Sequence, residues 1–180
     1  MKLFKAYRPF LIFLAKFFGT YAVLTVAYTL YLRPYEFRGK PDPVTMAVAN
    51  QSRVAIGWLG ANSQVIPEFE KPWVRLTYNN KYVARIIEGC NAVSVMILFA
   101  SFVVAFAGKW LATVIFIFVG SAVIHFLNII RIALLCAALF HWPSQEHLLH
   151  GVVFPLTIYG VVFLLWVLWV NRYSNHARSR

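Results

Sequence analysis

Long runs of apolar residues dominate this 180-residue chain and constrain its fold more than any other feature. A helix that crosses a lipid bilayer needs about 20 mostly apolar residues. Candidate runs cover residues 17–32, 92–107, 111–130 with a continuation to 140, and 152–170. Apolar residues make up 61% of the chain and charged residues only 13%, which argues against an ordinary soluble domain. We therefore expect an all-α integral membrane protein with about four transmembrane helices, forming a single membrane-embedded domain over residues 1–180.

The distribution of charge predicts how these helices are oriented. Short cytoplasmic segments of membrane proteins are enriched in Lys and Arg. Residues 1–16, the short connection at Lys109 and the tail 171–180 carry eight basic residues and no acid, whereas all six acids lie elsewhere with the other nine basic residues. Both termini are therefore expected to be cytoplasmic, and segment 33–88 is expected on the outer face. The basic residues then act as orientation signals and lipid-headgroup contacts, which argues against nucleic-acid binding.

The outer segment carries structural signals of its own. The stretch "PDPVTMAVANQSRVAIGWLGAN" favours an amphipathic helix that lies along the membrane. Further on, "WVRLTYNNKYVARIIEG" alternates apolar and polar residues on both sides of Asn79-Asn80, and asparagine tolerates positive φ. This second pattern predicts a small β-hairpin whose second strand leads to Cys90. The residues assigned to the apolar side of the helix are Val44, Ala47, Val54, Ala55, Trp58 and Leu59.

Cys90 stands at the start of the second apolar run, in the stretch "EGCNA". Two structural interpretations compete with a catalytic one: a small buried apolar side chain, or a disulfide with Cys136 on an oxidising outer side. Cys136 lies inside the apolar stretch "RIALLCAALF", which argues against the disulfide and favours simple packing for Cys136. Cys90 remains a candidate nucleophile, because the predicted topology places it at the outer membrane surface.

Arg131 lies within the apolar stretch "VIHFLNIIRIALLCAAL". A charged side chain inside a membrane segment is costly and by default indicates a functional site. The competing interpretation is that Arg131 extends to the headgroups at the outer interface. Asn128 lies three residues earlier on the same helix face, so it is placed to orient the guanidinium.

Two histidines, His147 and His150, precede the last apolar run at a spacing that puts them on one helix face. Beyond Cys90 and Glu146 no third ligand is near, and no metal-binding motif is present, so we expect no metal and no cofactor. Together with Arg131 these residues supply the parts of a thiol acyl-transfer site: a nucleophile, a proton-exchanging imidazole and a cation for the oxyanion. The alternative is a non-enzymatic membrane assembly or transport protein with a polar cavity around Arg131.

The order of these residues resembles the signature of exosortases and archaeosortases, a cysteine followed by Asn-x-x-Arg and then by a histidine before the last span. The stretches "EGCNA", "NIIRI" and "VFPLTIYGVVFLLWVLWVN" carry the resemblance, which covers residues 5–172 and is closest to the short F-type exosortases of Bacteroidetes. Larger exosortases often read Cys-Ser-Gly where this chain reads Cys-Asn-Ala. They also tend to show His-x-x-x-Gly, which His147 matches through Gly151, whereas His150 fits the F-type pattern better.

The resemblance implies a thiol protease or transpeptidase of the cell inner membrane with its active site toward the periplasm. Such enzymes cleave the C-terminal sorting signal of exported proteins, which is a short motif, a transmembrane helix and a basic tail. Carried over by position, Cys90 would be the nucleophile and Arg131 the cation that orients the substrate or stabilises the oxyanion. His150 would be the acid/base, with His147 as the alternative. The implied partners are exported proteins with such a tail and membrane lipids.

Overall fold

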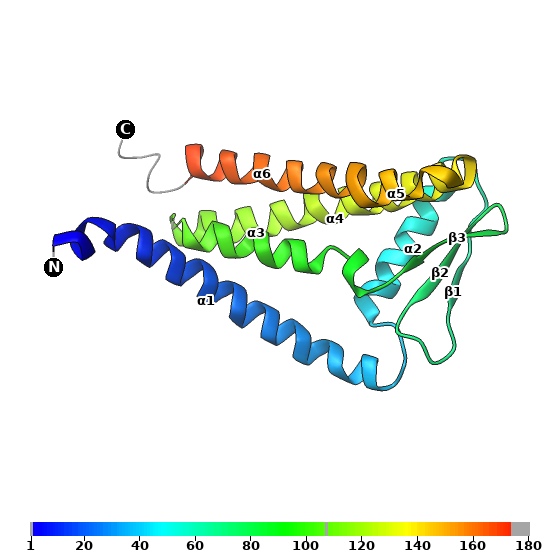
Figure 1. Ribbon diagram of the computed structural model, residues 1–180, viewed down its shortest axis with the longest axis horizontal. Helices are drawn as coiled ribbons and strands as arrows, with labels where there is room; N and C mark the ends of the chain where they lie inside the picture. The colour runs from blue at the N-terminus through cyan, green and yellow to red at the C-terminus, as the bar shows by residue number, and fades with distance from the viewer. Residues whose placement is uncertain (1, 107, 174–180) are drawn as a thin grey trace.

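The computed structural model describes residues 2–106 and 108–173, with side chains described throughout except at residues 2–6 and 150. Long helices form an elongated bundle, and a cap made of one helix and a small sheet covers one end of it (Figure 1). Among the described residues, three segments are long and apolar enough to cross a membrane: α1 (Lys2–Phe37), α4 (Trp110–His141), and 143–172, which contains α6 (Phe154–Arg172). A further apolar helix, α3 (Val93–Ala105), is shorter.

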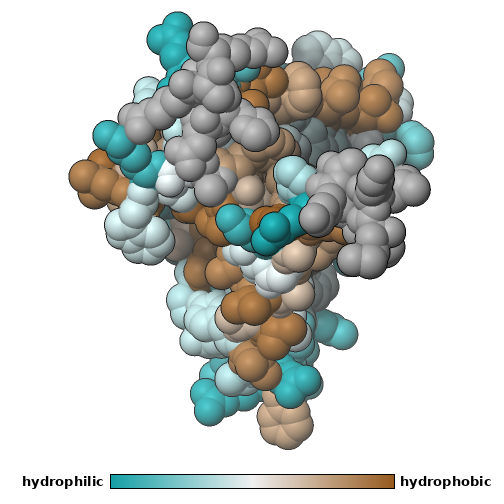
Figure 2. Space-filling view, turned by 90° about the vertical axis from the view of Figure 1, so that its left-hand side faces the viewer, coloured by the Kyte–Doolittle hydropathy of each residue, from teal (hydrophilic) through white to brown (hydrophobic). Residues whose placement is uncertain are grey.

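The sides of the long helices are apolar and uncovered. Val23 on α1, Phe118 on α4 and Leu156 on α6 leave 68%, 77% and 71% of their surface exposed. Figure 2 looks onto one end of the bundle and shows apolar groups that reach the outside of the molecule between hydrophilic ones. Large contiguous apolar surfaces are rare on soluble proteins, whereas lipid tails accept them readily. The exposed sides therefore support an integral membrane protein.

Contacts identify which segments share an end of the bundle. The indole Nε1 of Trp169, near the end of α6, donates a hydrogen bond to the carbonyl oxygen of Phe106 after α3 (3.1 Å). A Cβ added to Gly108 would lie 2.9 Å from the carbonyl oxygen of Tyr173. The α3–α4 connection and the end of α6 are thus neighbours, on the same side as the start of α1 (Figure 1). The cap lies at the other end, and residues 174–180 of the predicted tail lie outside the described residues.

Two helices extend further than the apolar runs predicted. α1 is continuous from Lys2, so residues 2–16, expected as a separate N-terminal segment, belong to the same helix. α4 continues without a break through Asn128 and Arg131 to His141. Asn128 lies 18 residues after Trp110, which is about 27 Å along a helix at 1.5 Å per residue. A hydrocarbon core is about 30 Å thick, so the part of α4 before Arg131 is long enough to span one, and the part after it packs in the cap.

The helix α2 (Pro43–Trp58) opens the cap and crosses the end of the bundle (Figure 1). The Asp42 carboxylate accepts hydrogen bonds from the backbone N–H groups of Val44 (2.9 Å) and Thr45 (3.1 Å). Those groups have no partner within the helix, so this cap defines where α2 begins. The opposite end of α2 leads into the loop before the sheet. The face that packs against α4 and the sheet is Thr45, Val48, Ala49, Ser52, Ala55 and Ile56.

The amphipathic helix was predicted, but its apolar residues divide between two sides. Of the positions assigned to one apolar side, Ala55 is buried in the cap, whereas Val54 and Trp58 are 46% and 74% exposed. Gln51, on the exposed side, has its Oε1 2.8 Å from Nε2 of His125, one turn before Asn128 on α4. Gln51 thus adds a polar contact with α4 beside the buried face of α2, while Val54 and Trp58 remain uncovered.

The predicted hairpin is present, and within the described chain it belongs to a three-stranded antiparallel sheet of order β1-β2-β3. Asn79 and Asn80, with φ of 48° and 63°, join β2 (Val74–Tyr78) to β3 (Lys81–Ile86). Both values suit a type I′ turn. The strand β1 (Val65–Pro67) was not predicted and pairs with β2. Consequently β3 is an edge strand, and it leads to the 3₁₀ turn η1 (Glu88–Cys90) before α3.

Two buried apolar clusters hold the cap and the bundle together. The cap cluster includes Val48, Ile56, Leu76, Ile86, Ile132 and Cys136. The bundle cluster includes Phe99, Val103, Ile124, Val162 and Trp169. In the bundle, a Cβ on Gly120 would lie 2.3 Å from Cζ of Phe99. The absence of a side chain at Gly120 therefore allows α3 and α4 to pack closely.

Candidate active site

Cys90 ends the turn η1 and is half-buried. The turn closes because the Cys90 N–H donates to the carbonyl oxygen of Ile87 (2.9 Å) and the Asn91 N–H donates to that of Glu88 (3.2 Å). The side-chain oxygen of Asn91 then accepts a hydrogen bond from the backbone N–H of Val93 at the start of α3 (3.0 Å). The thiol is thus held between the end of an edge strand and the beginning of the apolar helix α3.

Asn91 fixes this turn from two further directions. Its side chain is 1% exposed, and its Nδ2 donates to the hydroxyl of Tyr28 on α1 (2.8 Å) and to the hydroxyl of Thr45 on α2 (3.2 Å). Burial raises the pKa of the neighbouring Glu88 carboxyl, and a hydrogen bond with Tyr28 partly opposes that effect. The residues on both sides of Cys90 along the chain are therefore tied to α1 and α2.

Ala92 adopts a left-handed conformation, with φ of 64° and 5% exposure. A residue with a Cβ pays about 1–2 kcal/mol for this conformation, and glycine avoids that cost. The glycine of the Cys-Ser-Gly pattern would stand at this position. The turn after Cys90 therefore has a backbone conformation that suits either sequence, with alanine as the strained choice.

Asn128 links Cys90 to Arg131. It is 0% exposed, its Nδ2 donates to the carbonyl oxygen of Cys90 (2.8 Å), and its Oδ1 accepts from Nη1 of Arg131 (3.3 Å). The guanidinium also lies within electrostatic range of the Cys90 sulfur and of Tyr159 on α6. Nε of Arg131 is buried and has no hydrogen-bond partner among the described residues. The cation thus lies near the thiol and keeps one donor free.

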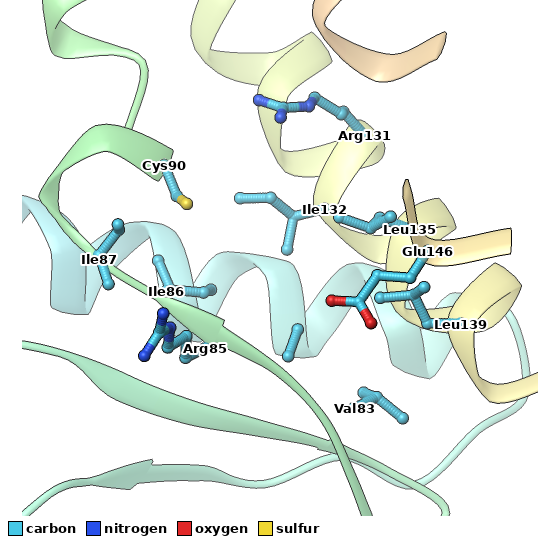
Figure 3. Close-up of a pocket in the computed structure, with 11 residues that line it drawn as sticks. Val83, Arg85, Ile86, Ile87, Cys90, Arg131, Ile132, Leu135, Leu139 and Glu146 are labelled. Carbon is cyan, nitrogen blue, oxygen red and sulfur yellow. The ribbon is translucent and has the colours of Figure 1, made fainter. Parts of the chain in front are cut away.

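Cys90 and Arg131 line one cavity of about 280 Å³ at the junction of bundle and cap. Figure 3 shows the Cys90 sulfur directed into it, Arg131 above, and the Glu146 carboxylate entering from the opposite side. β3 and the residues after it form one wall, and the outer part of α4 forms the other through Ile132, Leu135 and Leu139. The cavity is therefore mostly apolar, with a thiol, a cation and a carboxylate at its margin.

The structure brings together some of the predicted site residues and not others. Cys90, Asn128 and Arg131 meet as described above. His147 is exposed in the short helix α5 (Glu146–Leu148) and does not line the cavity. His150 lies in the π-helical turn η3 (Leu149–Val153), but its side chain lies outside the described residues.

Sequence reasoning missed two residues near the site. Glu146 faces the cavity although its neighbour His147 does not. Tyr159 on α6 lies within electrostatic range of Arg131. The only sequence signal for Tyr159 was a polar hydroxyl in an otherwise apolar run. Nothing in the sequence distinguishes Glu146 from other exposed acids.

Within the part of the chain that the structure describes, no group of three or more His, Cys, Asp or Glu side chains could hold a metal ion. Both cysteines are free thiols, with Cys136 fully buried in the cap. No protein-family model, no curated protein and no solved structure matches the chain. The chemistry of the site is therefore argued from its own geometry: a half-buried thiol beside a cation with a free donor suits attack on a carbonyl and stabilisation of the resulting oxyanion.

Proposed function

We propose that this protein is a membrane-embedded cysteine peptidase or transpeptidase of the exosortase type. It cleaves the C-terminal sorting signal of exported proteins. The observation that carries the proposal is the position of Asn128, which binds the Cys90 carbonyl with one end of its amide and Arg131 with the other. A thiol and a guanidinium held in this way share one cavity.

The proposed topology has four spans, with both termini cytoplasmic and the cavity at the periplasmic face of the inner membrane. The charge pattern supports it, because the start of α1, the connection at Lys109 and the end of α6 at Arg172, which carry basic residues and no acid, lie at the end opposite the cap. α3 contributes the fourth span despite its length. The turn before it contacts Asn128 in the outer part of α4, and its far end contacts Trp169 at the other end of the bundle.

The Cys90 thiol transfers its proton to the imidazole of His150, or of His147 in the alternative. The thiolate attacks the carbonyl carbon of the scissile peptide bond and forms a C–S bond, while Arg131 donates hydrogen bonds to the developing oxyanion. The C–N bond then breaks, and the imidazole of His150, or of His147 in the alternative, protonates the leaving nitrogen. Water or an acceptor amine attacks the thioester carbonyl, and the Cys90 thiolate departs. Water gives hydrolysis and an amine gives transfer to an anchor.

The test is co-expression with a candidate exported protein whose C-terminus carries a short motif, an apolar helix and a basic tail. Cleavage is followed as the loss of that tail. Cys90→Ala should abolish cleavage, and Arg131→Ala should lower its rate about 10²–10³-fold, as expected for removal of an oxyanion donor. Arg131→Lys should retain part of the activity, since it keeps the charge but not the forked donors.

Cys136→Ala is the matched control, because it removes the other thiol, which is buried in the cap, and should leave cleavage unchanged. His150→Ala and His147→Ala separate the two candidates for the acid/base. Loss with His147→Ala alone would assign the proton transfer to His147. Cleavage that survives Cys90→Ala would refute the thiol mechanism and would favour the assembly or transport alternative, in which Arg131 lines a polar cavity.

A further inference from the structure

The edge strand β3 and the residue after it form one wall of the cavity. Five consecutive residues line it: Val83, Ala84, Arg85, Ile86 and Ile87. Successive side chains of a strand point to opposite faces of the sheet. β3 has a bulge at Val83, where the register with β2 shifts. Residues 84–87 follow that bulge and still border the same cavity in succession, so the cavity runs along the edge of the strand and the backbone that follows. Sheet order places β2 on the other edge of β3, so this edge is the one without a partner strand.

An unpaired strand edge presents free backbone N–H and C=O groups. Here that edge faces an apolar wall made of Ile132, Leu135 and Leu139 of α4. The strand also leads directly to Cys90 through the turn η1 (Figure 3). A peptide that paired with this edge would thus have its backbone satisfied by β3, its side chains against α4, and its next carbonyl at the thiol.

We propose that the substrate segment before the scissile bond binds as an extended strand along the free edge of β3, parallel to it. The proposal rests on the proposed function and names the binding mode of that site. β3 runs from the hairpin turn toward Cys90 at the membrane junction. A sorting signal also runs from its exported part toward the membrane, so the two chains share a direction. The last four residues of β3 and Ile87 after it span about 17 Å at about 3.3 Å per residue, which accommodates about five substrate residues.

This binding mode defines a class of substrate. In strand addition, main-chain hydrogen bonds provide affinity and pockets for alternate side chains provide selectivity. Alternate residues of the segment should therefore be apolar to contact Ile132, Leu135 and Leu139, and the residues between them are free to vary. Proline is excluded wherever the substrate N–H must donate to β3, because proline has no N–H.

The test uses the full chain in detergent micelles and a disulfide probe that requires no cleavage. The probe is an acetylated Val-Thr-Val-Thr-Val peptide whose C-terminal cysteamine sulfur is in a disulfide with 2-mercaptoethanol. The Cys90 thiolate attacks the cysteamine sulfur and forms a mixed disulfide, and the 2-mercaptoethanol thiolate leaves. At a fixed concentration of competing 2-mercaptoethanol, intact mass spectrometry gives the equilibrium fraction tethered. Cys90→Ala, which retains only buried Cys136, gives the background.

Three modified probes test the pairing. N-methylation of alternate amides in one register should lower the tethering equilibrium at least tenfold, and N-methylation in the other register should leave it unchanged. A reversed probe, with the sulfur attached at the N-terminus, should tether at least tenfold less well than the original. Equal tethering of all four probes overturns strand pairing, and better tethering of the reversed probe overturns the parallel direction.

A pair of variants tests the same site from the protein side. Leu139→Trp adds volume to the wall that faces β3 and should reduce tethering of the original probe about tenfold. Leu134→Trp is the matched control, because Leu134 lies on the same helix, is 45% exposed and does not line the cavity. Equal effects of the two variants would contradict the proposed position of the peptide.

The proposed peptidase function and the proposed strand-binding mode can each be refuted without the other. If Cys90-dependent cleavage is observed but N-methylation has no effect in either register, the strand-binding mode is wrong and the peptidase stands. If N-methylation lowers tethering in one register only, but no tail is cleaved in a Cys90-dependent way, the strand-binding mode is supported and the proposed peptidase function is wrong.

Discussion

Replacing Asn128 with alanine removes two hydrogen bonds at the junction of bundle and cap. The Cys90 carbonyl loses its donor at 2.8 Å, and Arg131 loses its acceptor at 3.3 Å. Because Asn128 is fully buried, water does not readily replace either bond. Alanine also leaves a cavity that the neighbouring side chains fill only in part.

The size of the effect follows from the two bonds. A neutral hydrogen bond contributes about 1 kcal/mol and one to a charged group about 1.5–3 kcal/mol. Their sum predicts a loss of about 3 kcal/mol in the free energy of unfolding. For a chain of this length each kcal/mol corresponds to about 2–4 °C, so the unfolding midpoint should fall by about 6–12 °C.

The measurement is thermal unfolding in detergent micelles, followed by circular dichroism. Asn50→Ala is the matched control: Nδ2 of Asn50 donates to the carbonyl oxygen of Met46 at 3.0 Å, but on an exposed surface. Its effect should stay within about 0.5 kcal/mol. Asn128→Asp keeps an acceptor for Arg131 and loses the donor to Cys90, so its midpoint should fall between wild type and Asn128→Ala. Equal midpoints for Asn128→Ala and Asn50→Ala would refute the assigned role of Asn128.

Three further predictions concern single positions. Gly120→Ala places a methyl group 2.3 Å from Phe99 Cζ and should cost about 1–3 kcal/mol by overpacking, with partial recovery in the double variant with Phe99→Leu. Ala92→Gly relieves the left-handed strain at φ 64° and should change stability by less than about 0.5 kcal/mol, because glycine also raises the entropy of the unfolded chain, whereas Ala92→Val should be clearly destabilising. Burial raises the pKa of Glu88, so the folded protein binds that proton more tightly than the unfolded chain. Its contribution to stability is therefore present at low pH and is lost as pH rises through the raised pKa; Glu88→Gln should remove this slope and be more stable at neutral pH.

All three are checked by unfolding midpoints in the same micelles. Additive effects of Gly120→Ala and Phe99→Leu would contradict the close helix contact. Equal stability of Ala92→Gly and Ala92→Val would contradict the left-handed turn. A Glu88→Gln variant whose midpoint keeps the same pH slope as wild type would show that another group titrates there.

Periodic patterns made part of this fold predictable. The hairpin was found because alternation continued on both sides of Asn79-Asn80, and both residues have positive φ in the structure. The strand β1 was missed because it has only three residues and ends at Pro67. The helix α2 was predicted correctly. Its apolar residues were assigned to one side, because the pattern alone does not show which of them meet the sheet.

The site was predictable where covalent spacing or membrane depth constrained it. Asn128 and Arg131 are one turn apart on one helix, and their common depth with Cys90 followed from the predicted topology. The contact of Asn128 with the backbone of Cys90, rather than with its thiol, depends on how the turn η1 packs and has no sequence signature. The same holds for Glu146, whose direction depends on the fold of the chain between α4 and α6.

The uninterrupted course of α4 has a mechanical consequence. The helix α4 is long and apolar enough to cross the lipid, and its far part packs against α2 and the sheet and bears the Arg131 guanidinium. A thicker or thinner bilayer changes the tilt of a spanning helix at modest cost. Because α2 and the sheet pack on this part of α4, such a tilt moves them together with Arg131. The turn that holds Cys90 is also bound to α1 through Asn91 and Tyr28, so a change in the tilt of α4 relative to α1 acts directly on the space around the thiol.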